Sequence, residues 1–80
     1  MALFRLHHQH RADECPVVFA AWLGFASPLR RHATLASCVS GGHEIWWDVE
    51  ADSARTALAH LPRYVAARTE AIAVVKVEIP

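Results

Sequence analysis

The pair Gly41-Gly42 lies between two β-prone stretches and strongly limits the folds open to this chain. Two-residue hairpin turns favour glycine because their central positions take positive φ angles. We therefore predict a hairpin of two strands, residues 34–40 and 43–51. With a two-residue turn, Cys38 would lie opposite Ile45 on the face of the hairpin that forms the core.

The segments on either side of this hairpin supply four more elements. Residues 3–10 and 71–80 alternate in a way typical of strands. A helix is predicted after the first of these strands, from the N-cap residue Asp13 to about Ala26, where Ser-Pro follows. A second helix is predicted to begin at residues 52–53, and Pro62 is expected to kink or divide it near His60.

The resulting order is strand, helix, strand, strand, helix, strand. Right-handed crossovers convert this order into an antiparallel sheet with strand order 4-1-3-2 and both helices on one face. We therefore predict an α+β, ferredoxin-like β-α-β-β-α-β fold. Its 80 residues are expected to form a single domain, residues 1–80.

Composition excludes several classes of partner. Eight basic and eight acidic residues cancel, which removes the electrostatic argument for binding nucleic acid. The longest apolar run covers residues 15–26, whereas a membrane helix needs about 20 residues. No signal peptide is recognised, and two cysteines are too few for a secreted disulfide framework. We expect a cytoplasmic protein with reduced thiols that binds neither nucleic acid nor a membrane.

The predicted topology gathers reactive side chains at one edge of the sheet. The end of the first strand, the start of the first helix and the hairpin turn meet there. They bring together three histidines and both cysteines, namely His8, His10, Cys15, Cys38 and His43. Thiolate and imidazole groups are ligands for zinc, copper or nickel. We therefore predict that this edge holds a metal ion or another small ligand.

Two other interpretations of the same residues stay open. Cys15 lies in the first turn of a predicted helix, where the helix dipole lowers a thiol pKa, and nearby histidines are candidate bases. It would then be a reactive thiol. Alternatively, Cys38 is a small core residue, Cys15 is an ordinary helix residue, and the histidines are satisfied polar side chains.

The sheet face without helices is a second candidate surface. We expect it to form the interface of a homodimer through Arg5, His7, Trp46, Asp48 and Val74. A bare sheet face that carries a tryptophan is seldom left to water, and tryptophan often anchors interfaces. A sharper alternative pairs His7 with Asp48, so that the carboxylate orients the imidazole as a base.

The element order, the size and the segments DECP, SGGHEIWW and LPRYVAART resemble a group of small bacterial proteins. The chain is similar over nearly its whole length to the dimeric α+β barrel group of ferredoxin-like proteins. That group includes muconolactone isomerases, small cofactor-independent monooxygenases, polyketide cyclases and short metal-binding proteins. The resemblance implies a dimer and assigns no catalytic residue, because no motif of the group matches residue by residue.

A homo-oligomer that binds a metal or a small ligand is the function we predict first. The alternative is a cofactor-independent isomerase, cyclase or monooxygenase with His8 or His43 as acid–base. Such an enzyme needs a cavity of about 300 Å³ or more, lined by Trp22 or Trp47. A third candidate is a structural module that binds another protein. Whether the chain is an enzyme is left open by the sequence.

Overall fold

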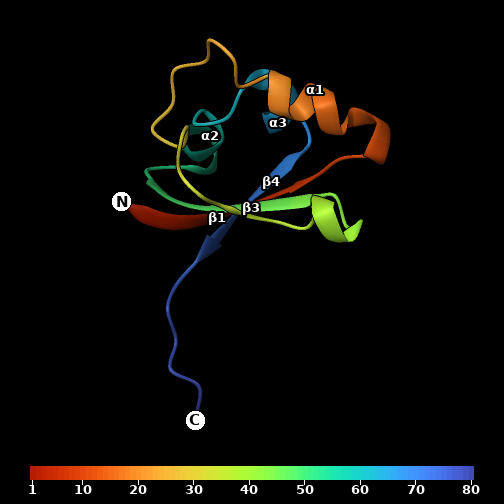
Figure 1. Ribbon diagram of the computed structural model, residues 1–80. Coiled ribbons are helices and arrows are strands. Elements are labelled where there is room, and N and C mark those ends of the chain that lie inside the picture. The colour runs from red at the N-terminus through yellow and green to blue at the C-terminus, as the bar shows by residue number, and fades with distance from the viewer.

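The computed structural model describes residues 1–80 and contains one four-stranded sheet (Figure 1). The strands are β1 (Ala2–Gln9), β2 (Leu35–Ala36), β3 (Glu44–Ala51) and β4 (Thr69–Val74). Their order across the sheet is β2-β3-β1-β4, and every neighbouring pair is antiparallel. β1 is therefore a central strand that is paired along both edges.

The helical segments are all short. They are η1 (Ala12–Glu14), α1 (Cys15–Ala20), η2 (Cys38–Ser40), α2 (Ala54–Leu58) and α3 (Arg63–Ala66). Figure 1 shows α1, α2 and α3 on one side of the sheet, together with the loop that links α1 to β2. None of these helices has the length and apolar character needed to cross a bilayer.

The ferredoxin-like prediction is wrong, because the two full helices that it requires are absent. The predicted helix from Asp13 to Ala26 ends at Ala20, after which the chain continues in turns and Gly24 takes a φ of +77°. The predicted second helix is two separate pieces, α2 and α3. Pro62 divides them because it lacks an N–H, and it stands at the N-cap of α3. The fold is a four-stranded antiparallel sheet covered by short helical segments and loops.

The predicted hairpin register is also wrong. β2 contains only Leu35 and Ala36, and Ala36 rather than Cys38 pairs with Ile45. The chain between β2 and β3 forms the short helix η2, and Gly41 closes it with a φ of +87°. A longer loop, residues 37–43, therefore replaces the two-residue turn. The last predicted strand is likewise shorter, since residues 75–80 leave the sheet and extend away from it (Figure 1).

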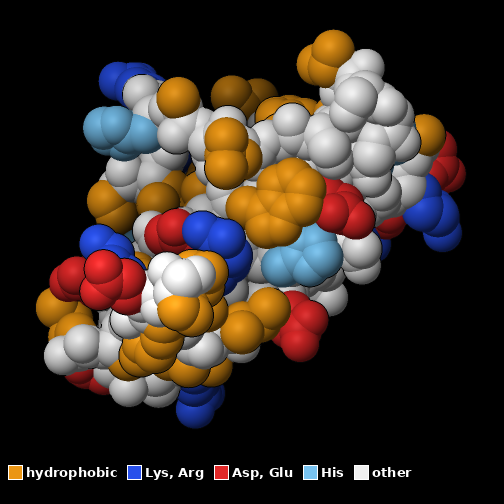
Figure 2. All heavy atoms as spheres, turned by 90° about the horizontal axis from the view of Figure 1, so that it is seen from below, with side chains coloured by type: hydrophobic (Ala, Val, Ile, Leu, Met, Phe, Trp, Pro, Cys, Tyr) orange, Lys and Arg blue, Asp and Glu red, His pale blue; other side chains and the backbone are white.

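The core lies between the sheet and the short helices. Phe4, Leu6 and His8 point inward from β1, as the alternation of residues 3–10 predicts. The buried apolar residues are Phe4, Leu6, Val18, Ile45, Trp47, Val49, Ala51, Ala57, Leu61 and Val65. The opposite face of the sheet carries hydrophobic side chains among charged ones and histidine (Figure 2).

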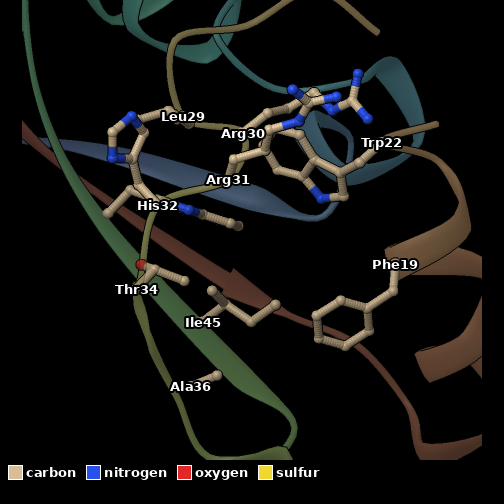
Figure 3. A pocket seen from close by; sticks show the side chains of 10 residues that line it. Phe19, Trp22, Leu29, Arg30, Arg31, His32, Thr34, Ala36 and Ile45 are labelled. Carbon is tan, nitrogen blue, oxygen red and sulfur yellow. The ribbon is translucent and has the colours of Figure 1, made fainter. Parts of the chain in front are cut away.

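A cavity of about 270 Å³ opens between the α1–β2 loop and the β2–β3 side of the sheet (Figure 3). Trp22 and Trp47 line it, as the enzyme hypothesis requires of its cavity. Neither His8 nor His43 lines it. The predicted acid–base residues therefore do not face this space.

Glu14 lies directly before α1 and forms hydrogen bonds with residues in α3 and just after it. One carboxylate oxygen accepts hydrogen bonds from the Tyr64 hydroxyl at 3.0 Å and from Arg68 Nε at 2.8 Å. The other oxygen accepts the backbone N–H of Arg11 at 2.9 Å. These bonds lower the pKa of Glu14 to about 2, and the bond from the Arg11 N–H has the largest effect. The carboxylate is therefore ionised in the folded protein well below its usual range.

Glu14→Gln should lower stability at neutral pH, because the amide cannot form the charge-assisted bond to Arg68. A pKa that is lower in the folded state stabilises the fold above the usual value near 4.5, and this contribution disappears as pH falls toward about 2. Urea unfolding between pH 7 and pH 2 measures both variants. The gap between wild type and Glu14→Gln should close across that range. Glu50→Gln, at an exposed carboxylate without an ion pair, is the matched control. Equal stability of wild type and Glu14→Gln at pH 7 would contradict this role.

Candidate metal centre

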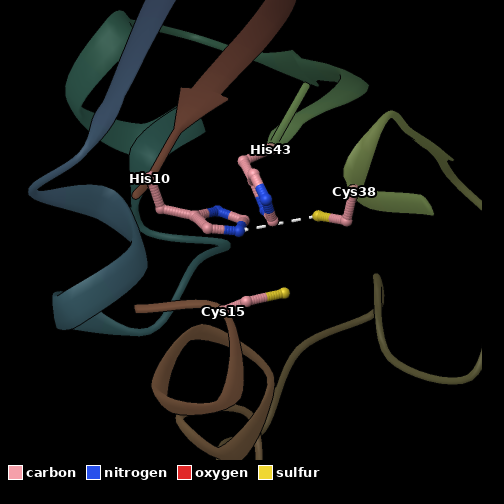
Figure 4. A group of neighbouring side chains, drawn as sticks. All are labelled: His10, Cys15, Cys38 and His43. Carbon is pink, nitrogen blue, oxygen red and sulfur yellow. Dashed lines mark hydrogen bonds between the residues drawn. The ribbon is translucent and has the colours of Figure 1, made fainter. Parts of the chain in front are cut away.

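Two histidines and two cysteines converge at one end of the sheet (Figure 4). His10 follows β1, Cys15 begins α1, Cys38 begins η2, and His43 precedes β3. One nitrogen or sulfur atom of each lies within 4.8 Å of those of the other three. The structure thus brings together four of the five residues that the topology argument selected.

The β1–β3 register places the two histidines. Gln9 pairs with Glu44 at the end of the antiparallel ladder, so the next residue outward on each strand lies beside the other. The backbone N–H of His10 donates to the carbonyl of His43 at 3.1 Å. Their imidazole rings are 5.4 Å apart between centroids.

The loop of residues 37–43 holds Cys38 near His43. Ser37 closes the loop, because its hydroxyl accepts the backbone N–H of Glu44 at 3.0 Å and its carbonyl accepts that of Gly42 at 2.8 Å. A Cβ at Gly42 would collide with the Ser37 side chain. Glycine at this position lets the loop close so tightly. The loop therefore presents a thiol at one end and an imidazole at the other.

Cys15 reaches the cluster from the opposite side of the site, on α1. It is the first residue of the helix, directly after the anchored Glu14, and Pro16 follows it. Proline is tolerated there because an N–H in the first turn has no partner within the helix. The bonds of Glu14 to Tyr64 and Arg68 thus also fix the position of the neighbouring thiol.

His8 lies directly behind His10 and is fully buried. Its Nδ1 is 2.9 Å from the Thr69 hydroxyl oxygen and 3.2 Å from the carbonyl oxygen of Val65. The carbonyl only accepts, and the Thr69 hydroxyl already donates to it at 2.7 Å. The proton of the neutral ring therefore belongs on Nδ1 of His8.

This assignment determines the state of His10. Burial lowers the pKa of His8, so its ring is neutral at pH 7 and its Nε2 is an acceptor. His8 Nε2 is 3.0 Å from His10 Nδ1, which must then carry the proton. His10 Nε2 is left with a lone pair that faces the cluster, 3.5 Å from Cys38 Sγ. A metal-ligating histidine is commonly oriented in this way by a partner behind it.

The cluster contains one buried polar atom that lacks a partner. His43 Nδ1 is buried and makes no hydrogen bond. Burial, followed by the neighbouring Cys15, raises the pKa of the Cys38 thiol. A bound cation would satisfy the lone pair of an imidazole and stabilise a thiolate.

The spacing is close to that of tetrahedral zinc. With Zn–S bonds of about 2.3 Å and Zn–N bonds of about 2.0–2.1 Å, neighbouring ligand atoms lie roughly 3.3–3.8 Å apart. The distance of 3.5 Å from His10 Nε2 to Cys38 Sγ is already in this range. The whole set lies within 4.8 Å, so a contraction of at most about 1.5 Å between any two ligand atoms would complete the geometry.

The remaining predicted residues have other places. His8 contributes no atom to the cluster and instead positions His10. The predicted pair of His7 and Asp48 is wrong, because the β1–β3 register pairs Asp48 with Arg5. Arg5 holds Asp48 through two bonds of 2.8 and 2.9 Å. His7 instead stacks on Trp46, and its Nε2 lies 3.2 Å from a carboxylate oxygen of Glu44.

Three supporting residues escaped prediction from the sequence. Nothing in the sequence marks Glu14, Val65 or Thr69 as part of a site. The last two lie 57 and 61 positions from His8 in the chain. Only the packing of α3 and β4 against β1 brings them to it.

Comparison with known proteins adds no relative to this description. No protein-family model, curated protein or solved structure matches the chain. The function must therefore be inferred from the geometry of the site.

The tautomers of the two buried histidines are directly measurable. We expect His8 and His10 of the metal-free protein both to carry the proton on Nδ1 at pH 7, because the carbonyl of Val65 accepts only. Long-range ¹H–¹⁵N correlation spectra distinguish the two ring nitrogens. The exposed His32 is the internal control, and the ¹⁵N shifts of its two ring nitrogens should be averaged over both tautomers. A proton on Nε2 of His8 would contradict the assigned chain of hydrogen bonds.

Proposed function

We propose that this protein binds one zinc ion through His10, Cys15, Cys38 and His43. The observation that carries the proposal is the convergence of two thiols and two imidazoles, with one donor atom of each inside 4.8 Å. They come from two segments of the chain, residues 10–15 and 38–43, that are far apart in sequence. Two cysteines and two histidines are a common donor set for tetrahedral zinc.

The donor chemistry favours zinc over the other metals considered. A tetrahedral S₂N₂ set is typical of zinc, whereas copper(II) and nickel(II) favour square-planar or tetragonal sites. Copper(I) favours soft thiolate and thioether ligands over imidazole. No carboxylate belongs to the cluster, which makes calcium and magnesium poor candidates.

The role that fits the site is structural. Four protein ligands fill a tetrahedral zinc and leave no open position for a substrate. The chain has ten buried apolar residues, and its helices are four to six residues long. Small domains of this kind often depend on a metal or disulfide for stability. Here the metal would join the end of β1, the start of α1 and the loop of residues 37–43.

The test is metal content and metal-dependent stability of protein made without a histidine tag. We expect about one zinc per chain by elemental analysis and a higher melting temperature for the zinc form than for the metal-free form. At a hundredfold excess of zinc over its Kd, the gain is about 2.7 kcal/mol. For a domain of this size that corresponds to a shift of roughly 10–20 °C.

Variants separate specific binding from general affinity of histidine for metals. Cys38→Ser and His43→Ala should abolish stoichiometric binding and the thermal shift. His32→Ala, at an exposed histidine outside the cluster, should leave both unchanged. The proposal is wrong if wild-type protein carries no metal and added zinc, copper or nickel leaves its melting temperature unchanged.

We further propose that the protein is a homodimer through the sheet face opposite the short helices. Trp46 lies on this face, half-buried and stacked on His7, and its β2 neighbour Leu35 is 72% exposed. Residues 75–80 extend from the same side of the sheet, with exposed Val75, Val77 and Ile79 (Figure 1). Arg5 and Asp48 are already paired within the chain, so a partner need cover only the apolar residues.

Trp46→Ala should weaken this association by about 2 kcal/mol or more, because a central tryptophan commonly anchors an interface. Sedimentation equilibrium over a range of protein concentrations measures the change. Leu23→Ala removes a side chain that is 77% exposed on the side of the helices and should leave association unchanged. A wild-type protein that sediments as a monomer at micromolar concentration would rule out the dimer.

A further inference from the structure

The cavity between the α1–β2 loop and the sheet is separate from the metal ligands. It has a volume of about 270 Å³, and six of its ten lining residues are hydrophobic. None of the four proposed zinc ligands lines it. Its contents are therefore a question distinct from that of the metal.

Aromatic rings form the walls of the cavity. Trp22 and Trp47 lie 5.8 Å apart between ring centroids, with their planes inclined at 49°. Phe19 is also part of the wall, although its side chain is 53% exposed. An aromatic surface that remains open in so small a protein is suited to a flat apolar ligand.

A group of basic residues lines the same cavity. Arg30, Arg31 and His32 are consecutive and all belong to its lining. Figure 3 shows them toward one end, with Phe19 and Ile45 toward the other. None of the three forms an ion pair, whereas the arginines at positions 5, 11 and 68 all do.

The positive charge at this end is local. The chain as a whole has a net charge of zero with histidine neutral. Arg30 makes one hydrogen bond, from Nη1 to the carbonyl of Phe25 at 3.3 Å, which leaves most of its donors free. Arg31 has a φ of +66°, in the left-handed region that residues with side chains rarely adopt. The turn thus places unpaired guanidinium groups beside an aromatic cavity.

We propose that this cavity binds a small aromatic carboxylate. The ring lies against Phe19, Trp22 and Trp47, and the carboxylate accepts hydrogen bonds from the guanidinium groups of Arg30 and Arg31. Guanidinium is the side chain that matches a carboxylate with two parallel bonds. The volume lies just below the usual range for ligand pockets, about 300–1,000 Å³, which limits the ligand to one or two fused rings.

Calorimetric titration with 2-naphthoate tests the proposal, and 2-naphthamide is the neutral probe of nearly the same shape. We expect one naphthoate per chain and at least tenfold weaker binding of the amide. Binding of naphthoate should weaken between 50 and 500 mM sodium chloride, whereas that of the amide should not. Equal affinity for the two probes, or no saturable binding of naphthoate, would overturn the proposal. Inorganic phosphate that binds as tightly as naphthoate would overturn the role of the aromatic wall.

The variant Arg30→Gln/Arg31→Gln should lose the preference for the carboxylate while still binding the amide. The matched control is Arg55→Gln/Arg63→Gln, at two exposed arginines that form no ion pair, and it should bind as wild type does. Retention of the full preference in the first variant would contradict the assigned role of these arginines. Trp22→Leu should weaken both probes alike, and unchanged binding there would contradict the ring position. The titrations use protein in its purified metal state, so a failure of zinc binding does not alter their interpretation.

Discussion

The antiparallel pairing of β1 with β3 on one side and β4 on the other holds this small protein together. Because side chains alternate along a strand, β1 sends Phe4, Leu6 and His8 into the core while Arg5 and His7 face outward. The register with β3 sets Asp48 opposite Arg5, and beyond the ladder it brings His43 to His10. The chemistry of the candidate metal centre is thus a consequence of strand pairing.

The second consequence is the chain of hydrogen bonds that begins at Val65. Its carbonyl and the Thr69 hydroxyl fix the proton of the buried His8, and the acceptor nitrogen of His8 in turn fixes the proton of His10. A fully buried imidazole is costly unless both ring nitrogens are satisfied. This arrangement satisfies both and directs the free lone pair of His10 toward Cys38. The same residues that stabilise the core therefore also orient a candidate metal ligand.

The sequence predicts the site better than it predicts the fold around it. Alternation in residues 3–10 identifies the inward face of β1, and chain connectivity alone places His10, Cys15, Cys38 and His43 at one end of the sheet. The length of the first helix was unpredictable because residues 15–26 are apolar on all sides, so no change of pattern marks its end. The pairing of His7 with Asp48 failed because register depends on tertiary contacts. The role of His8 escaped prediction for the same reason, since its partners belong to α3 and β4.

The central claim is that two cysteines and two histidines complete one tetrahedral zinc site. X-ray absorption spectroscopy at the zinc edge of the zinc-loaded protein tests it most directly, because it counts sulfur and nitrogen neighbours. The account predicts two sulfur atoms at about 2.3 Å and two imidazole nitrogens at about 2.0–2.1 Å. A first shell made only of nitrogen and oxygen atoms, or one with a single sulfur, would contradict it.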